Sequence, residues 1–208
     1  MLVSTLVVGS LEALEAVMDD DTLVDSWRER DVVVVPTAAA FGSLEEAAII
    51  CATPFESRGA RVEALMIADR SANAEEYFVA RLNDADVVVL SDGSALHARS
   101  VWRASPVGEA IARSRCLIAV GETATVLGST MIDPRGGAPT TGLAYRDGLV
   151  VTSEASSEQL ARTRSLLDDS LTLAVVGPGG VVIGNEGTWR ARGAVTLTRA
   201  GAPVDFAD

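Results

Sequence analysis

The sequence has 208 residues, of which 48% are hydrophobic, and its 29 acidic residues outweigh 17 basic residues to give a formal net charge of −12 at pH 7. A chain of this length can bury roughly 70% of its unfolded surface, which is enough for one full-sized domain. The acidic balance argues against nucleic acids and anionic membranes as partners, because phosphate binding needs a basic face, and it favours cationic ligands.

Short valine-rich runs alternate with longer amphipathic stretches up to about residue 169. The runs are short, β-branched and bounded by Gly, Pro or Asp, which is typical of strands. They cover residues 4–9, 31–36, 60–67, 84–90, 116–121 and 148–152. The amphipathic stretches, several of which open with Ser or Asn before acidic residues, predict helices at 10–18, 43–59, 73–84, 105–114 and 156–169.

Strands that are apolar on both faces suit the middle of a parallel sheet covered by helices. After residue 169, Gly and Pro recur at short intervals, which predicts an antiparallel meander over 170–208, with a hairpin turn at 177–180. We find no linker or internal repeat. The sequence therefore predicts a single domain over 1–208. Its α/β core, 1–169, is a doubly wound, mainly parallel sheet in a flavodoxin- or Rossmann-like three-layer sandwich, and its C-terminal β tail is short.

A cytoplasmic location is expected. The opening residues MLVSTLVVGS have neither the basic region nor the cleavage site of a signal peptide, and no apolar run approaches the length of about 18 residues that suggests a membrane span. Cys51 and Cys116 lie inside predicted elements, and we interpret both as reduced core residues. No cysteine spacing is typical of a metal site, and neither a metal nor a cofactor is expected.

Ligands of doubly wound sheets bind at the carboxyl ends of the strands, so the loops there are the first candidates for a site. The loop after the strand at 116–121 reads Gly121-Glu122-Thr123-Ala124-Thr125. It turns from a strand into a helix, and several enzyme folds place a nucleophile at such a corner. Thr123 is the candidate nucleophile of this corner, although a threonine that caps the helix would leave the same pattern.

Five segments, in chain order, carry a resemblance to a known family: VVVVPTAAA, ARVEALMIADRSANAEE, ADVVVLSDGSAL, LIAVGETATVLGSTMID and GLVV. From about Val3 to Ile183 the sequence resembles the cyanophycinase and aspartyl dipeptidase (peptidase E) serine peptidases. The resemblance implies a class I glutamine amidotransferase-like fold, a homodimer, and a nucleophile elbow of the form Gly-x-Ser-Ala-Gly at residues 121–125.

Three catalytic elements depart from the family's pattern. The elbow serine is replaced by Thr123 and the elbow's second glycine by Thr125, a β-branched residue that suggests a relaxed turn. The family's histidine falls near Glu154, and a carboxylate with a pKa of about 4 is a weak base for a hydroxyl. The family's Gly-Gly oxyanion loop becomes Asp92-Gly93, where a carboxylate would repel a developing oxyanion.

Asp92, Glu122 and Glu154 follow the strand ends that form the family's active site. If they converge, the former catalytic cleft is an acidic pocket, with Gly93 and Ala124 beside it. We therefore expect a protein without serine-peptidase activity that binds a small cationic or peptide-like ligand. Each carboxylate could instead point into solvent or cap its own helix.

An active hydrolase is the alternative function. Thr123 would then attack, with His97 or Glu154 as the base. His97 is the only histidine in the chain, and it follows the neighbouring loop SDGSAL. A hydrogen bond between the His97 ring and the Thr123 hydroxyl would distinguish this alternative.

Overall fold

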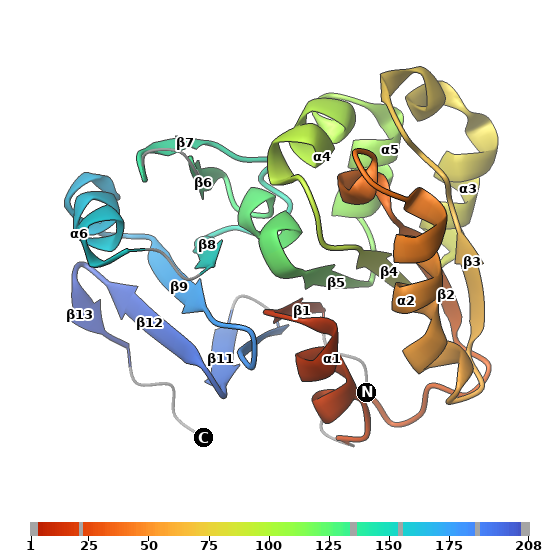
Figure 1. Ribbon diagram of the computed structural model, residues 1–208, viewed down its shortest axis with the longest axis horizontal. Coiled ribbons are helices and arrows are strands. Elements are labelled where there is room, and N and C mark those ends of the chain that lie inside the picture. The colour runs from red at the N-terminus through yellow and green to blue at the C-terminus, as the bar shows by residue number, and fades with distance from the viewer. Residues whose placement is uncertain (1–3, 21–22, 134–136, 154–155, 186–187, 205–208) are drawn as a thin grey trace.

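The structure, a computed structural model, describes residues 4–20, 23–133, 137–153, 156–185 and 188–204. Figure 1 shows a central sheet flanked by helices and a second, smaller sheet beside it. The α-helices are α1 (Leu11–Met18), α2 (Leu44–Glu56), α3 (Glu76–Asp84), α4 (Ala95–Trp102), α5 (Pro106–Ala112) and α6 (Ser157–Leu166). Three 3-10 helices are η1 (Thr37–Ala39), η2 (Arg70–Ala74) and η3 (Gly121–Val126).

The strands are β1 (Thr5–Val8), β2 (Asp31–Val35), β3 (Arg61–Ala64), β4 (Val87–Leu90), β5 (Cys116–Val120), β6 (Thr130–Ile132), β7 (Pro139–Thr141), β8 (Leu149–Ser153), β9 (Thr172–Val176), β10 (Val181–Asn185), β11 (Thr188–Arg192), β12 (Val195–Arg199) and β13 (Ala202–Pro203). The central sheet has the order β11-β10-β1-β5-β4-β2-β3, and β1, β5, β4, β2 and β3 run parallel. The predicted mainly parallel α/β fold is confirmed.

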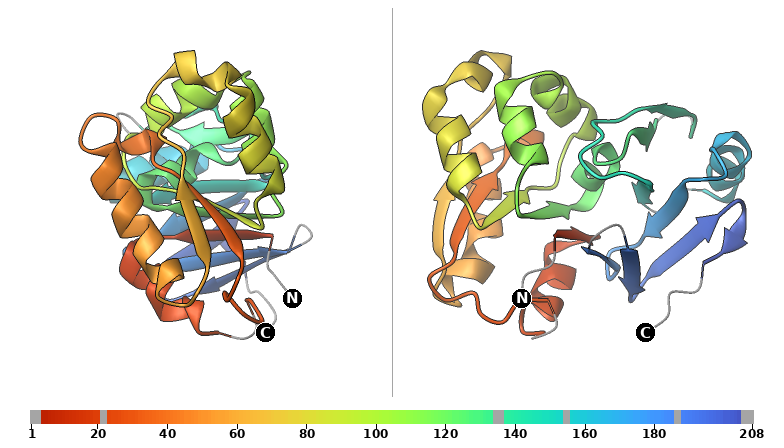
Figure 2. Two further views of the ribbon diagram at one scale, coloured as in Figure 1. Left: turned by 90° about the vertical axis from the view of Figure 1, so that its right-hand side faces the viewer. Right: turned by 180° about the vertical axis from the view of Figure 1, so that it is seen from behind.

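Successive side chains along each central strand point to opposite faces of the sheet. They therefore pack into two different hydrophobic cores. In β2, Val33 and Val35 face the core beneath α3, α4 and α5, whereas Val32 and Val34 face the core beneath α1 and α2. All four valines are fully buried. Figure 2 shows these helices on opposite faces of the sheet. A strand that is apolar at every position is therefore the pattern that a sheet covered on both faces needs.

The C-terminal strands do not form one meander. β10 and β11 form a hairpin that extends the central sheet, with β10 antiparallel to β1. β9 instead pairs parallel with β8 and antiparallel with β12, in a second sheet of order β13-β12-β9-β8. The antiparallel pairings of the tail were expected, but their division between two sheets was not.

The predicted hairpin turn at 177–180 is wrong, because the strands that this turn joins, β9 and β10, lie in different sheets. The turn is closed by a Gly180 N–H to Gly177 O hydrogen bond of 2.8 Å. It crosses the end of β1, where the Gly9 N–H donates to Gly180 O at 2.9 Å. A Cβ at Gly9 would lie only 1.9 Å from Gly177 O, so this approach requires glycine.

Both cysteines are buried and unpaired, as predicted. Burial raises the pKa of the Cys51 thiol to about 11 and that of Cys116 to about 12. Neither is poised to act as a nucleophile, since the reactive form is the thiolate. In the part of the chain that the structure describes, every helix is too short or too polar to cross a bilayer.

The guanidinium of Arg146 ties three parts of the fold together. It donates to Thr5 Oγ1 of β1 at 2.5 Å, to Ala112 O at the end of α5 at 3.1 Å, and to Tyr145 O at 2.7 Å. Burial lowers the pKa of Arg146 from its usual value. The partners are neutral oxygens, including the last carbonyls of a helix, where a cation is favoured.

We expect Arg146→Met to destabilise the protein by about 2–3 kcal/mol, because it removes charge-assisted hydrogen bonds from part-buried acceptors. Arg113→Met is the control: its ion pair with Glu109 is exposed, so it should cost about 0.5 kcal/mol or less. Urea unfolding followed by circular dichroism measures both. Equal stability of the two variants would contradict the role assigned to Arg146.

Candidate functional site

The corner after β5 is a relaxed turn. Residues 121–126 form the 3-10 helix η3, and the only positive φ within it is that of Gly121, at 57°. Thr123, which the resemblance aligns with the family's nucleophile, does not have the left-handed backbone of a strained elbow. The β-branched Thr125 fits this geometry, and its hydroxyl donates to Glu122 O at 2.8 Å.

The Thr123 hydroxyl is buried and already engaged. Thr123 is 0% exposed, and its Oγ1 donates to Ser91 O, just beyond the end of β4, at 2.7 Å. This bond joins the corner after β5 to the end of the neighbouring strand. The hydroxyl proton therefore points to a backbone carbonyl, which cannot accept it as a catalytic base would.

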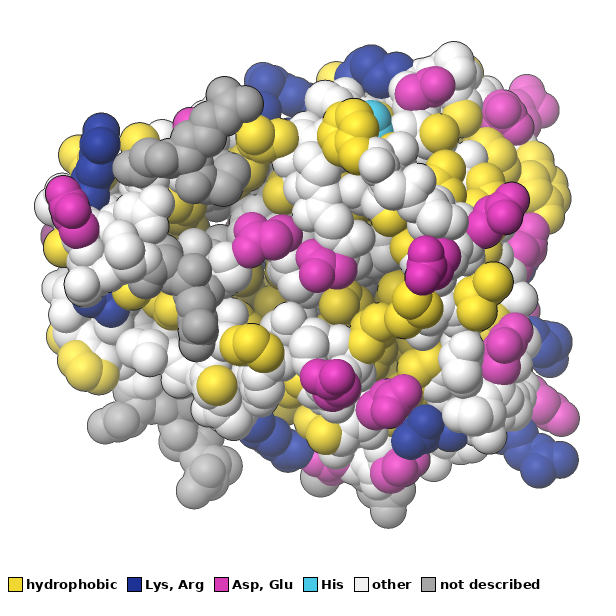
Figure 3. All heavy atoms as spheres, in the orientation of Figure 1, with side chains coloured by type: hydrophobic (Ala, Val, Ile, Leu, Met, Phe, Trp, Pro, Cys, Tyr) yellow, Lys and Arg dark blue, Asp and Glu magenta, His cyan; other side chains and the backbone are white. Residues whose placement is uncertain are grey.

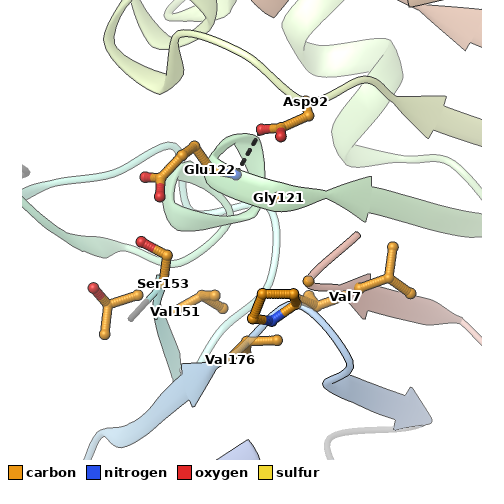
Figure 4. A pocket seen from close by; sticks show the side chains of 11 residues that line it. Val7, Asp92, Gly121, Glu122, Val151, Ser153 and Val176 are labelled. Atoms are coloured by element: carbon orange, nitrogen blue, oxygen red, sulfur yellow. Dashed lines mark hydrogen bonds between the residues drawn. The ribbon is translucent and has the colours of Figure 1, made fainter. Parts of the chain in front are cut away.

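Asp92 binds the two loops together through one carboxylate oxygen. Its Oδ1 accepts the Gly93 N–H at 2.7 Å and the Glu122 N–H at 2.9 Å, and Figure 4 shows the second of these bonds. Gly121 packs directly beneath it, since a Cβ at Gly121 would lie 2.3 Å from Asp92 Oδ1. Gly93 has a φ of 142° and a Cβ there would lie 2.3 Å from Ala38 O, so both loops require their glycine.

A pocket of about 280 Å³ opens at the carboxyl ends of β1, β5, β8 and β9. It is lined by Val7, Val8, Gly9, Asp92, Gly121, Glu122, Val151, Thr152, Ser153, Val176 and Pro178. Two of the three predicted carboxylates, Asp92 and Glu122, thus share one pocket (Figure 4). Figure 3 shows acidic side chains around a hollow near the middle of this face.

The pocket lining does not include the other predicted ligand-binding residues that the structure describes. Glu154 is outside the described residues. Ala124 is fully buried in the core, and neither it nor Gly93 lines the pocket. Among the described residues no group of three or more His, Cys, Asp or Glu side chains could hold a metal ion.

His97 is held away from the corner. Its Nε2 lies 2.8 Å from Ala68 O, and its ring contacts Phe41 edge-on with ring centres 4.8 Å apart. No hydrogen bond joins His97 to Thr123, and both residues are within the described part of the chain. The contact that would have favoured an active hydrolase is therefore absent from this structure.

Val176 and Pro178 form one wall of the pocket, and the sequence did not indicate that they would lie there. Val176 and Pro178 reach it because β9 pairs with β8 and the turn at 177–180 crosses the end of β1. The sequence predicts the strand at 172–176 as part of a C-terminal meander, and so gives no reason to expect its end at the pocket. The rule that ligands bind at strand ends would have included it had the parallel pairing been recognised.

Comparison with known proteins identifies the fold. No protein-family model matches the sequence, and no curated protein matches it either. A solved structure of a peptidase from an acI-B1 Actinobacterium is similar with a TM-score of 0.75 at 17% identity, over 99% of this chain and 98% of that chain. A candidate peptidase E protein from Listeria monocytogenes EGD-e is similar with a TM-score of 0.70 at 11% identity, over 92% and 98%. The chain has the fold of these peptidases.

The contact between Gly121 and Asp92 predicts strong energetic coupling. Gly121→Ala should destabilise the protein by about 2–4 kcal/mol, since the new methyl group meets a left-handed backbone and the Asp92 carboxylate. In an Asp92→Ala background the carboxylate is gone, and only the backbone cost of about 1 kcal/mol should remain. Denaturant unfolding of the four proteins gives the coupling energy. Additive effects would mean that the carboxylate does not pack against Gly121.

Proposed function

We propose that this chain is a peptidase E-like protein that has lost serine-peptidase chemistry and binds a small cationic or peptide-like ligand in the pocket beside the corner. The observation that carries the first half of the proposal is the buried Thr123 hydroxyl, which donates to Ser91 O. A hydroxyl nucleophile must be accessible and must give its proton to a base. Thr123 meets neither requirement.

The loop at Gly93 is also poorly suited to stabilise an oxyanion. Acyl transfer requires unoccupied N–H donors aimed at the developing oxyanion. The Gly93 N–H lies in the loop that matches the family's oxyanion loop, and it already donates to the Asp92 carboxylate. A negative charge beside that position would oppose a second one. This geometry supports the loss of nucleophile and oxyanion stabilisation together.

The pocket's lining supports a cationic ligand. Asp92 and Glu122 bring two carboxylates to it, and among the residues that the structure describes no Lys or Arg lines it. The Glu122 carboxylate makes no ion pair within the described chain, and the protein's net charge of −12 adds to the attraction. Val7, Val151 and Val176 offer apolar walls for an aliphatic stem. An amine or guanidinium on a short chain fits this combination.

We expect no peptidase activity from the wild-type chain or from variants that restore one or two of the family's catalytic residues. Thr123→Ser alone should stay inactive on aspartyl dipeptides and on aspartate–arginine polymer, and Thr123→Ser with Glu154→His should recover little. Catalytic groups that act as a unit are strongly non-additive, so restoring one or two returns almost nothing. The wild-type protein should also fail to react with a fluorophosphonate, which needs only an activated, accessible hydroxyl.

A one-to-one fluorophosphonate adduct mapped to Thr123 by peptide digestion would contradict this part of the proposal. It would support the alternative, an active hydrolase with Thr123 as nucleophile and Glu154 or His97 as base, which the likeness to peptidases alone favours. A known serine peptidase under the same conditions is the positive control.

We expect the pocket to bind polyamines or arginine-containing dipeptides with an affinity that falls as salt rises. For spermidine, Asp92→Asn and Glu122→Gln should each weaken binding by about 3–10-fold, through the loss of one charge near the ligand. Asp92→Asn keeps an oxygen that can accept the two N–H groups, so the loops should hold their shape. Isothermal titration calorimetry measures each affinity.

The matched control for these two variants is Glu56→Gln, which removes one negative charge at the exposed end of α2. It should leave the affinity unchanged. An equal loss with Glu56→Gln would mean that overall charge drives binding, and no binding by any cation would remove the ligand half of the proposal. The homodimer expected from the resemblance stays a prediction, which light scattering at micromolar concentration would test.

A further inference from the structure

The two carboxylates of the acidic pocket occupy different places in it. Asp92 comes from the loop after β4, whereas Glu122 stands on η3, after β5. Figure 4 shows the Glu122 side chain running from the turn away from Asp92 and toward Ser153. An ammonium group that contacts one of these carboxylates therefore leaves the other without a cation.

Each carboxylate keeps oxygen atoms that a ligand can reach. Asp92 is exposed and Glu122 is partly exposed. Asp92 Oδ1 accepts two backbone N–H groups, whereas Oδ2 accepts no hydrogen bond from the residues that the structure describes. Within the same residues, the Glu122 carboxylate has no hydrogen bond or ion pair.

The Glu122 end of the pocket holds one more acceptor. Figure 4 shows the side chains of Ser153 and Glu122 pointing toward each other. Ser153 is partly exposed, and its hydroxyl has no partner among the described residues, so it can accept an N–H from a ligand. The pocket therefore offers acceptors for cations at two separate points.

The wall opposite the turn is apolar. Val7, Val151 and Val176 lie there in Figure 4, on β1, β8 and β9. Methylene groups that leave water for such a wall favour binding. At about 280 Å³, the pocket is smaller than the range of about 300–1,000 Å³ that is typical of sites for drug-sized ligands, so it suits a short ligand.

We propose that the ligand of this pocket is a short linear diamine with one ammonium group on each carboxylate. One ammonium binds Asp92 Oδ2, and the other binds the Glu122 carboxylate and the Ser153 hydroxyl. The methylene groups between them contact the valines. The pocket thus selects for two charges at two points, a property that rests on the proposed function and narrows its class of ligand.

Isothermal titration calorimetry of the full chain with 1,4-diaminobutane and 4-amino-1-butanol tests this arrangement. The two ligands differ only in the replacement of one ammonium group by a neutral hydroxyl. We expect the diamine to bind about 3–10-fold more tightly, because only the diamine places a charge on each carboxylate.

Asp92→Asn and Glu122→Gln should each reduce this advantage of the diamine to about twofold or less, since one carboxylate is then gone. Each should weaken the amino alcohol by no more than about twofold, because its single ammonium can use the carboxylate that remains. Glu122→Gln gives the test independently of the loops, since the Glu122 carboxylate holds no backbone N–H of the described chain.

Glu56→Gln is the control for general attraction of a doubly charged ligand, and it should keep the full advantage of the diamine. Equal binding of the two ligands to the wild-type chain would overturn the two-point arrangement and leave the cationic pocket standing. An advantage that survives both pocket variants, or that Glu56→Gln lowers equally, would also overturn it. No binding of either amine at millimolar concentration would overturn it together with the ligand half of the proposed function.

Discussion

One carboxylate oxygen organises the carboxyl end of this sheet. Asp92 Oδ1 receives an N–H from its own loop and another from the corner after β5, and so fixes the two loops to each other. Gly121 can lie beneath it only because it has no side chain. The carboxylate thus satisfies one backbone N–H group from each of the two loops. The same end of the sheet holds the 3-10 turn η3 and the buried Thr123 hydroxyl, which donates to Ser91 O. The Asp92 and Glu122 side chains line the pocket there.

Local pattern was enough to predict the central sheet. Residues 32–35 and 87–90 are apolar at every position, which is typical of a strand covered on both faces, and they lie in β2 and β4 as expected. The partners of β9 and β10 could not be predicted in the same way. Their pairing depends on register with β8 and β1, far away in the chain, and two short Gly-bounded strands look alike whichever sheet they join.

The candidate site was predictable in part for the same reason. Because Asp92 and Glu122 both follow central strands, the rule that ligands bind at strand ends predicts from the sequence alone that they lie close together. The Thr123–Ser91 bond spans 32 positions and depends on side-chain direction, which sequence does not reveal.

We propose that the Thr123 hydroxyl is a structural donor to Ser91 O and not a nucleophile. Its most direct test is the exchange rate of the Thr123 hydroxyl proton with water, measured by NMR on protein labelled at threonine. A buried hydroxyl held at 2.7 Å from a carbonyl should give a resolved, slowly exchanging proton signal with a contact to Ser91. A hydroxyl proton in fast exchange with solvent, or one whose neighbour is His97, would contradict the account.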